Sequence, residues 1–219
     1  MPQDSNICCH CNLYHPLGAS SCSRCGQTLV LGAKNKVAIW RLGDIQDGLL
    51  GGVVTAIWTA FSLKAVIQPA FLDERPSLRP SWKGRSATAL LNQMSNRNVS
   101  GTVANLCIAA DTVTCSTRYN FLFGMAWLGL GAAVMGIEPL AVDDPEPEIL
   151  SERMAKIAVH ELGHAFGLED MPYDHADCVM CGDTDLDSLD TLDHGSIDFC
   201  GPCMRRLQTG LHRSRNRAR

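Results

Sequence analysis

The sequence lacks the features expected of a nucleic-acid-binding protein. Its 219 residues carry a formal net charge of −4, only 6% of them are aromatic, and no segment interleaves aromatic with basic side chains. Proteins that bind nucleic acid usually gather basic and stacking groups on one surface. The basic end of the chain, residues 212–219, is therefore interpreted as a disordered, solvated tail.

Membrane and export signals are also missing. Residues 49–63 are uncharged, but this run of 15 residues is shorter than the roughly 20 that a bilayer requires. Thr55, Thr59 and Ser62 repeat within it at helical spacing, so a core-facing helix over about 45–63 is predicted. The opening residues, MPQDSN, have neither the basic start nor the apolar run of a secretory signal. A cytoplasmic location is expected.

Cysteine, in contrast, is abundant. Eleven cysteines occur, most of them in C-x-x-C pairs, and in a reducing compartment such pairs indicate metal sites rather than disulfides. The first two pairs are separated by ten residues, which is a zinc-ribbon spacing. Their four thiolates are Cys8, Cys11, Cys22 and Cys25, with Gly26 supplying a tight turn after the last. Less regular alternative ligands are Cys9, His10 and His15.

Residues 1–30 are thus predicted to be a zinc-ribbon-like module. A segment this short cannot bury enough apolar surface by itself, so zinc binding would supply its folding energy. We expect the module to bind a protein partner or to act as a tether.

The pattern H-E-x-x-H lies within SERMAKIAVHELGHAFGLED. Residues four apart share one face of a helix, so His160 and His164 can hold one Zn²⁺ while Glu161 reaches a water on that metal. The opposite stripe of this helix is apolar and is expected to face the core. Ser151 is predicted to cap the helix start, and Gly167 to end the helix through a left-handed backbone.

A catalytic zinc site needs a third protein ligand and one open position. In the extended pattern H-E-x-x-H-x-x-G-x-x-H, this ligand follows the second histidine by six residues, where the chain has Asp170. A carboxylate oxygen binds zinc at nearly the same distance as an imidazole nitrogen. Because the carboxylate adds a negative charge, activity is expected at higher pH than with three histidines. His175 is the rival third ligand.

Two further C-x-x-C pairs lie beyond the histidines and are separated by eighteen residues, which fits a second four-cysteine zinc site. Its predicted ligands are Cys178, Cys181, Cys200 and Cys203. The acidic stretch between the pairs, DTDLDSLDTLD, lacks the glycine and glutamate of a calcium loop at the right offsets and is interpreted as solvated.

Strands and helices alternate ahead of the histidine helix. Helices are predicted over 45–63 and 86–96, with a last one over 202–211, and strands over 36–42, 64–68, 103–110, 121–126 and 132–137. This order indicates an α+β, α/β-like fold with a twisted, mixed five-stranded sheet. The strand at 121–126, with Phe121 and Phe123, is the candidate edge for holding an extended peptide by main-chain hydrogen bonds.

Together these motifs resemble the archaemetzincins, a family of metzincin-type zinc peptidases. The likeness rests on the segment from Ser151 onward, on Cys178-Val179-Met180, on FCGPC at 199–203 and on the paired strands before the helix. It implies a peptidase domain over 36–219, with an N-terminal part (36–167) and a small zinc-stabilised C-terminal part (168–211). It also implies that Met180 is the Met-turn methionine beneath the catalytic zinc.

By the same resemblance, Cys178, Cys200 and Cys203 match three ligands of the family's structural zinc. Two positions depart from the family pattern: Asp170 replaces a histidine, and Met171 stands where the family has its first structural cysteine. Cys181 offers a replacement for that missing cysteine.

The expected function is zinc-dependent hydrolysis of a peptide or protein substrate, with Glu161 as general base. We expect one zinc at the catalytic centre, one in the C-terminal part and one in the N-terminal module. The alternative is a weak or inactive zincin scaffold that binds partners through its zinc ribbon. Intact Glu161 favours the enzyme.

Overall fold

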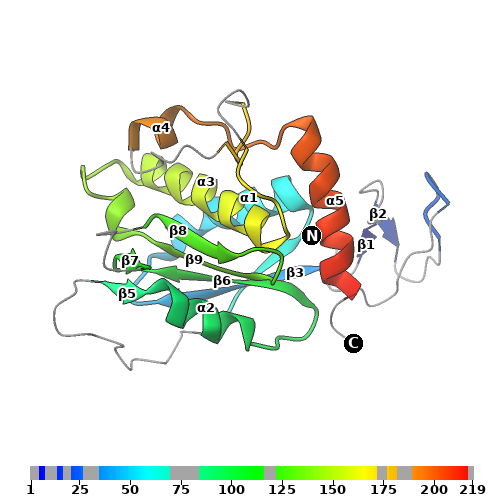
Figure 1. Cartoon of the computed structure of the whole chain (residues 1–219), viewed down its shortest axis with the longest axis horizontal. Coiled ribbons are helices and arrows are strands. Elements are labelled where there is room, and N and C mark those ends of the chain that lie inside the picture. Colours follow the sequence, from blue (N-terminus) through cyan, green and yellow to red (C-terminus); the bar gives the residue numbers. More distant parts are fainter. Residues whose placement is uncertain are drawn as a thin grey trace.

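A five-stranded sheet forms the centre of the computed structural model, which describes residues 5–7, 14–16, 21–26, 35–69, 84–115, 122–171, 177–181 and 189–216. The strand order is β4-β3-β6-β9-β8 (Figure 1). Their bounds are β3 (Lys36–Leu42), β4 (Lys64–Ile67), β6 (Thr102–Ala109), β8 (Gly124–Trp127) and β9 (Ala132–Gly136). Four strands are parallel, and only β8 runs antiparallel to its neighbour. The predicted mixed sheet of five strands is confirmed.

The burial of each strand follows its sequence. All eight residues of β6, TVANLCIA, are buried, as expected for a central parallel strand covered on both faces. Strand β8 lies at the edge of the sheet, and its four residues are half-buried. The turn from β8 to β9 uses Gly129 and Gly131 at φ of 67° and 71°, a backbone that glycine adopts without strain.

Helices cover both faces of the sheet. Helices α1 (Asp47–Phe61) and α3 (Pro147–Ala165) lie on one face, and α2 (Ala87–Ser95) lies on the other (Figure 1). Helix α1 buries Leu50, Val53 and Ile57 against α3, which confirms that the uncharged run is a core-facing helix. Within the described parts of the chain, no helix is both long and apolar enough to cross a membrane.

The C-terminal part consists of α4 (Leu189–His194) and α5 (Gly201–Asn216). The prediction that the last helix stops at residue 211 and gives way to a disordered tail is wrong, because α5 continues to Asn216. Leu211 and Ser214 remain on its buried face, and arginine is a good helix former, so both packing and propensity extend the helix.

The remaining elements are short. Strands β1 (Ser5–Ile7) and β2 (Tyr14–Pro16) form an antiparallel pair, β5 (Arg85–Ser86) pairs with β7 (Val113–Thr114), and η1 (Glu138–Leu140) precedes α3.

One knuckle of the predicted zinc ribbon is described. The Gly26 N–H donates to the Cys22 carbonyl over 2.9 Å at a φ of 72°, and the Arg24 N–H donates to Cys22 Sγ over 3.4 Å. The predicted turn at Gly26 is confirmed. Cys8 and Cys11 lie outside the described residues, so the four-thiolate site stays a prediction.

Candidate metal centre

Helix α3 carries the histidines and is longer than predicted. It begins at Pro147, so the predicted cap at Ser151 is wrong. Proline suits a first helical turn because its φ is preset and the missing N–H needs no partner there, and Glu148 adds favourable negative charge. The predicted end is confirmed, since Gly167 follows the helix with a φ of 95°.

Each histidine ring is oriented by a backbone carbonyl. Nδ1 of His160 lies 2.8 Å from the Val179 oxygen, and Nδ1 of His164 lies 2.7 Å from the Leu168 oxygen. A carbonyl can only accept, so each Nδ1 carries a proton and each Nε2 of a neutral ring presents a lone pair. The two Nε2 atoms are 3.0 Å apart. Two lone pairs that converge in this way fit a shared cation.

Asp170 completes this group. Its Oδ1 lies 3.2 Å from His164 Nε2 and 3.5 Å from His160 Nε2. Two imidazole nitrogens and one carboxylate oxygen form a ligand set that suits zinc, and three protein ligands leave a position open for a water. The rival ligand, His175, lies outside the described residues.

Glu161 lies beside the two histidines and is buried, with 6% of its surface exposed. Its Oε2 has no hydrogen-bond partner in the described part of the chain. A buried carboxylate oxygen left in this state costs free energy unless a water or ligand satisfies it. The site therefore has an acceptor positioned for a molecule that the protein itself does not supply.

The pKa values of these groups are coupled. Burial, together with the charge of His164, lowers the pKa of His160 to about 4. Burial also lowers the pKa of His164, but the hydrogen bond with Asp170 and the charge of Glu161 outweigh it, so this pKa rises to about 9. Burial raises the pKa of Glu161 to about 8. The metal-free site thus retains a proton between His164 and Asp170, where a cation can replace it.

The turn at residues 177–181 lies beneath α3. Met180 is fully buried, and its sulfur lies against Gly163, the residue before His164. The N–H of Cys181 donates to the Cys178 carbonyl over 2.8 Å and closes the turn. Because Val179 of the same turn accepts from His160, the turn fixes both the floor of the site and one ring orientation.

Three of the four predicted C-terminal thiolates come together. Sulfur atoms of Cys178, Cys200 and Cys203 lie within 4.8 Å of one another. Cys181 is not part of this group; it forms an isolated bridge with Met171, and its role as fourth ligand stays a prediction. No disulfide joins the cysteines that the structure describes.

The predicted substrate strand is displaced along the chain. Strand β8 begins at Gly124, after Phe123, which is buried, and Phe121 lies outside the described residues. The edge position of β8 agrees with the expected open strand edge next to α3.

Two interactions of helix α3 were missed by the sequence analysis. Gly124 lies directly against Glu161, so that a Cβ atom there would be 2.6 Å from Glu161 Cγ. A glycine inside a strand is a general signal for such a close approach. Arg153 is buried in α3 and donates to Asp143 and Asp193 at 2.7 Å each, and no local sequence pattern indicates this pairing.

Comparison with known proteins identifies relatives of this chain. The sequence model of Peptidase family M54 matches residues 90–209. The archaemetzincin of Thermococcus kodakarensis is 36% identical over 187 residues, which cover 80% of this chain and 96% of that protein. The archaemetzincin of Pyrococcus abyssi is 39% identical over 99 residues, 43% of this chain. In that match and similar ones, the chain spans about half the length of the curated relative, 50% for Pyrococcus abyssi.

Solved structures agree with this likeness. The crystal structure of archaemetzincin from Methanopyrus kandleri has a TM-score of 0.69 at 25% identity and covers 83% of this chain and 98% of that one. Archaemetzincin from Archaeoglobus fulgidus, complexed with malonate, has a TM-score of 0.65 at 24% identity, and the match covers 78% of this chain and 99% of that one. At this identity the match supports the fold alone.

Proposed function

The chain belongs to peptidase family M54, and from this membership we propose that it is a zinc-dependent peptidase that acts on peptide or protein substrates. One observation carries the proposal. The Nε2 atoms of His160 and His164 and a carboxylate oxygen of Asp170 converge within 4.8 Å, beside a buried Glu161 oxygen that lacks a partner among the described residues. The alternative of an inactive scaffold is not favoured, because Glu161, the proposed general base, is intact and buried beside the two histidines.

In this proposal His160, His164 and Asp170 hold the zinc, which when bound polarises the scissile carbonyl and lowers the pKa of an attacking water. Glu161 accepts a proton from that water through its carboxylate and then donates it to the leaving amine. Burial raises the pKa of Glu161 to about 8, and the positive charge of a bound zinc would lower it toward the carboxylate form that accepts the proton.

The edge of β8 is proposed to hold the substrate as an added, extended strand. Main-chain hydrogen bonds would align the peptide along Gly124–Trp127, next to Glu161. Met180 would support the two histidines from below.

Cys178, Cys200 and Cys203, with Cys181 as fourth ligand, are proposed to hold a structural zinc that ties α5 to the turn at 177–181. A further zinc in the N-terminal module, a protein partner there and a cytoplasmic location remain part of the proposal. Thiolate ligands of this kind require a reducing environment.

The test compares zinc content and peptide-library digestion for wild type, Glu161→Ala and Asp170→Ala. We expect Glu161→Ala to retain its zinc and to lose roughly 10²- to 10⁴-fold in rate, the usual contribution of general base catalysis. Asp170→Ala is expected to lose the catalytic zinc only. Undiminished digestion by zinc-loaded Glu161→Ala refutes the mechanism, and full zinc retention by Asp170→Ala rejects Asp170 in favour of His175.

A further inference from the structure

The C-terminal segment that contains α5, residues 201–219, is rich in positive charge. Six of the 19 lysines and arginines lie within residues 201–219, a segment that contains no aspartate or glutamate. Because the whole chain has a net charge of −4, the remainder is markedly acidic. Such asymmetry indicates a surface for an anionic partner.

The arginines occupy the outer face of the helix. Cys203, Leu207, Gly210, Leu211 and Ser214 form the buried face of α5. Arg205, Arg206 and Arg213 are exposed, and we refer to these three as the arginine face. In the described ranges of the chain, no carboxylate lies within ion-pairing distance of any of them. Since the apolar side of α5 is already packed on the core, its exposed side can bind only through charge and hydrogen bonds.

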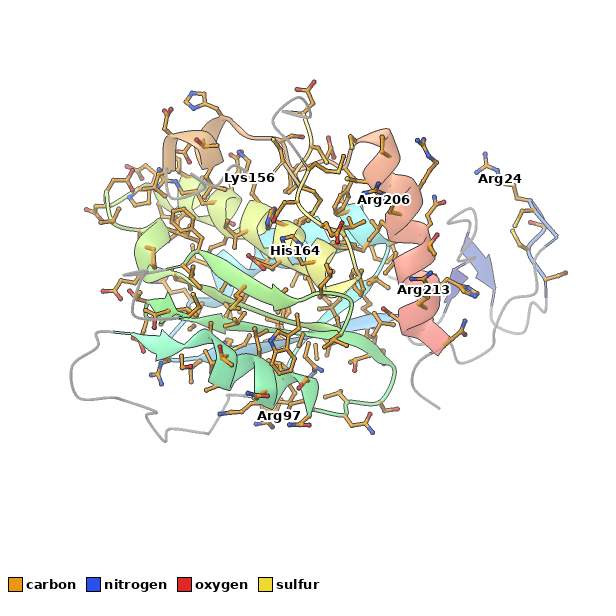
Figure 2. All side chains as sticks on the ribbon, in the orientation of Figure 1. Arg24, Arg97, Lys156, His164, Arg206 and Arg213 are labelled. Atoms are coloured by element: carbon orange, nitrogen blue, oxygen red, sulfur yellow. The ribbon has the colours of Figure 1, made fainter. Side chains whose placement is uncertain are left out.

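Three contacts hold the arginine face next to the metal centre. A Cβ atom at Gly210 would collide with the carbonyl oxygen of Phe166, so α5 lies directly on the chain that leaves α3. Cys203, in the first turn of α5, belongs to the cysteine group. Nη1 of Arg206 lies 4.0 Å from Sδ of Met171, the residue after Asp170. Figure 2 shows Arg206 and Arg213 along α5, beside the end of α3 that carries His164.

We propose that the arginine face is an exosite that binds an acidic segment of a protein substrate while an adjacent peptide bond is cleaved. Guanidinium groups pair with carboxylates in a two-pronged geometry, so successive arginines on one helix suit the spaced carboxylates of an extended acidic peptide. This inference rests on the proposed peptidase function, and it adds a substrate class to it.

A nucleic acid fits the same face less well. Helix α5 has no aromatic residue for base stacking. A phosphate backbone carries charge along its whole length and would meet the exposed carboxylates of Glu169 and Asp170 nearby. An acidic peptide segment, in contrast, can confine its charge to the part of the substrate that lies over α5.

The test uses two fluorescently labelled peptides that differ only in a run of glutamates replaced by glutamines. Their binding is measured by anisotropy to full-length, zinc-loaded Glu161→Ala, which does not cleave them. The double variant Arg206→Gln/Arg213→Gln in that background is compared with Arg41→Gln/Lys64→Gln, which removes the same charge from strands β3 and β4. We expect the first pair to weaken binding of the glutamate peptide by about three- to tenfold, and the control pair to leave it unchanged. High salt should abolish the difference.

Several outcomes overturn the exosite. These are equal affinity for the two peptides, equal losses in both double variants, or tighter binding of a single-stranded DNA of matched net charge. Cleavage by wild type distinguishes the two proposals. If wild type cleaves both peptides equally well, the exosite is wrong and the peptidase stands. If it binds the glutamate peptide through the arginine face and cleaves neither peptide, the peptidase function is wrong and the binding surface stands.

Discussion

Replacing Gly124 by alanine is expected to displace Glu161 while the metal ligands stay in place. An alanine Cβ in β8 would lie 2.6 Å from both Cγ and Oε1 of Glu161 and 2.8 Å from its Cδ. Favourable contacts between carbon atoms begin near 3.5 Å, so the two groups must separate by about 1 Å. The backbone at Gly124 is paired with Met135 of β9, and the side chain of Glu161 is therefore the part that moves.

The expected loss follows from this displacement. Misplacing a catalytic group by 1 Å can cost about 100-fold in rate, or about 2.7 kcal/mol in transition-state stabilisation. Overpacking is also expected to lower the free energy of unfolding by roughly 1–3 kcal/mol. The three atoms nearest to such a Cβ all belong to Glu161 and none to a proposed metal ligand, so zinc content should not change.

The assay measures kcat and KM on a quenched fluorescent peptide, together with bound zinc and a urea unfolding curve. Gly51→Ala is the matched control, because a Cβ at this exposed position of α1 would meet nothing within 4 Å. We expect Gly124→Ala to lower kcat far more than it raises KM. A folded, zinc-loaded Gly124→Ala protein with wild-type kcat would refute the reasoning, since it would mean that Glu161 tolerates the displacement or does not act in the reaction.

Other perturbations test the charges around the site. Asp170→His removes a negative charge and should move the rising limb of the pH–rate profile to lower pH; an unchanged profile contradicts the role of that charge. Because His164, with a pKa of about 9 in the metal-free site, must release its proton to bind zinc, zinc affinity measured by chelator competition should increase from pH 6.5 toward 9, by up to about tenfold per pH unit. A zinc affinity that does not change with pH would show that the proton on His164 does not compete with zinc. Arg153→Ala should lower the free energy of unfolding by about 3 kcal/mol in urea titrations, because it leaves a buried ion pair unmade. The control Arg41→Ala, which removes a more exposed ion pair, should cost less than about 1 kcal/mol. Equal losses in the two variants would refute a special role for the buried arginine.

Local sequence patterns predicted much of the fold and the centre of the site. The unbroken apolar run of β6 predicted a central strand, and the spacing of His160 and His164 predicted one helical face. Asp170 was found by its offset from His164, because a glycine-terminated helix returns the chain over a fixed short distance. In each case the decisive geometry lies within a few residues along the chain, where helix period, strand alternation and glycine conformation are intrinsic to the sequence.

What the sequence alone determined is therefore the set of candidate ligand and catalytic residues and the local elements that carry them. Tertiary structure alone decided that β8 is the strand at the sheet edge, that Gly124 lies against Glu161, and that Arg153 joins Asp143 to Asp193. It also decided that residues 212–216, which were expected to lie in a disordered basic tail, continue helix α5 beside the metal centre. These features depend on which segments, far apart in the sequence, are buried against each other. The free energy of that burial comes from the packed core and not from any single segment.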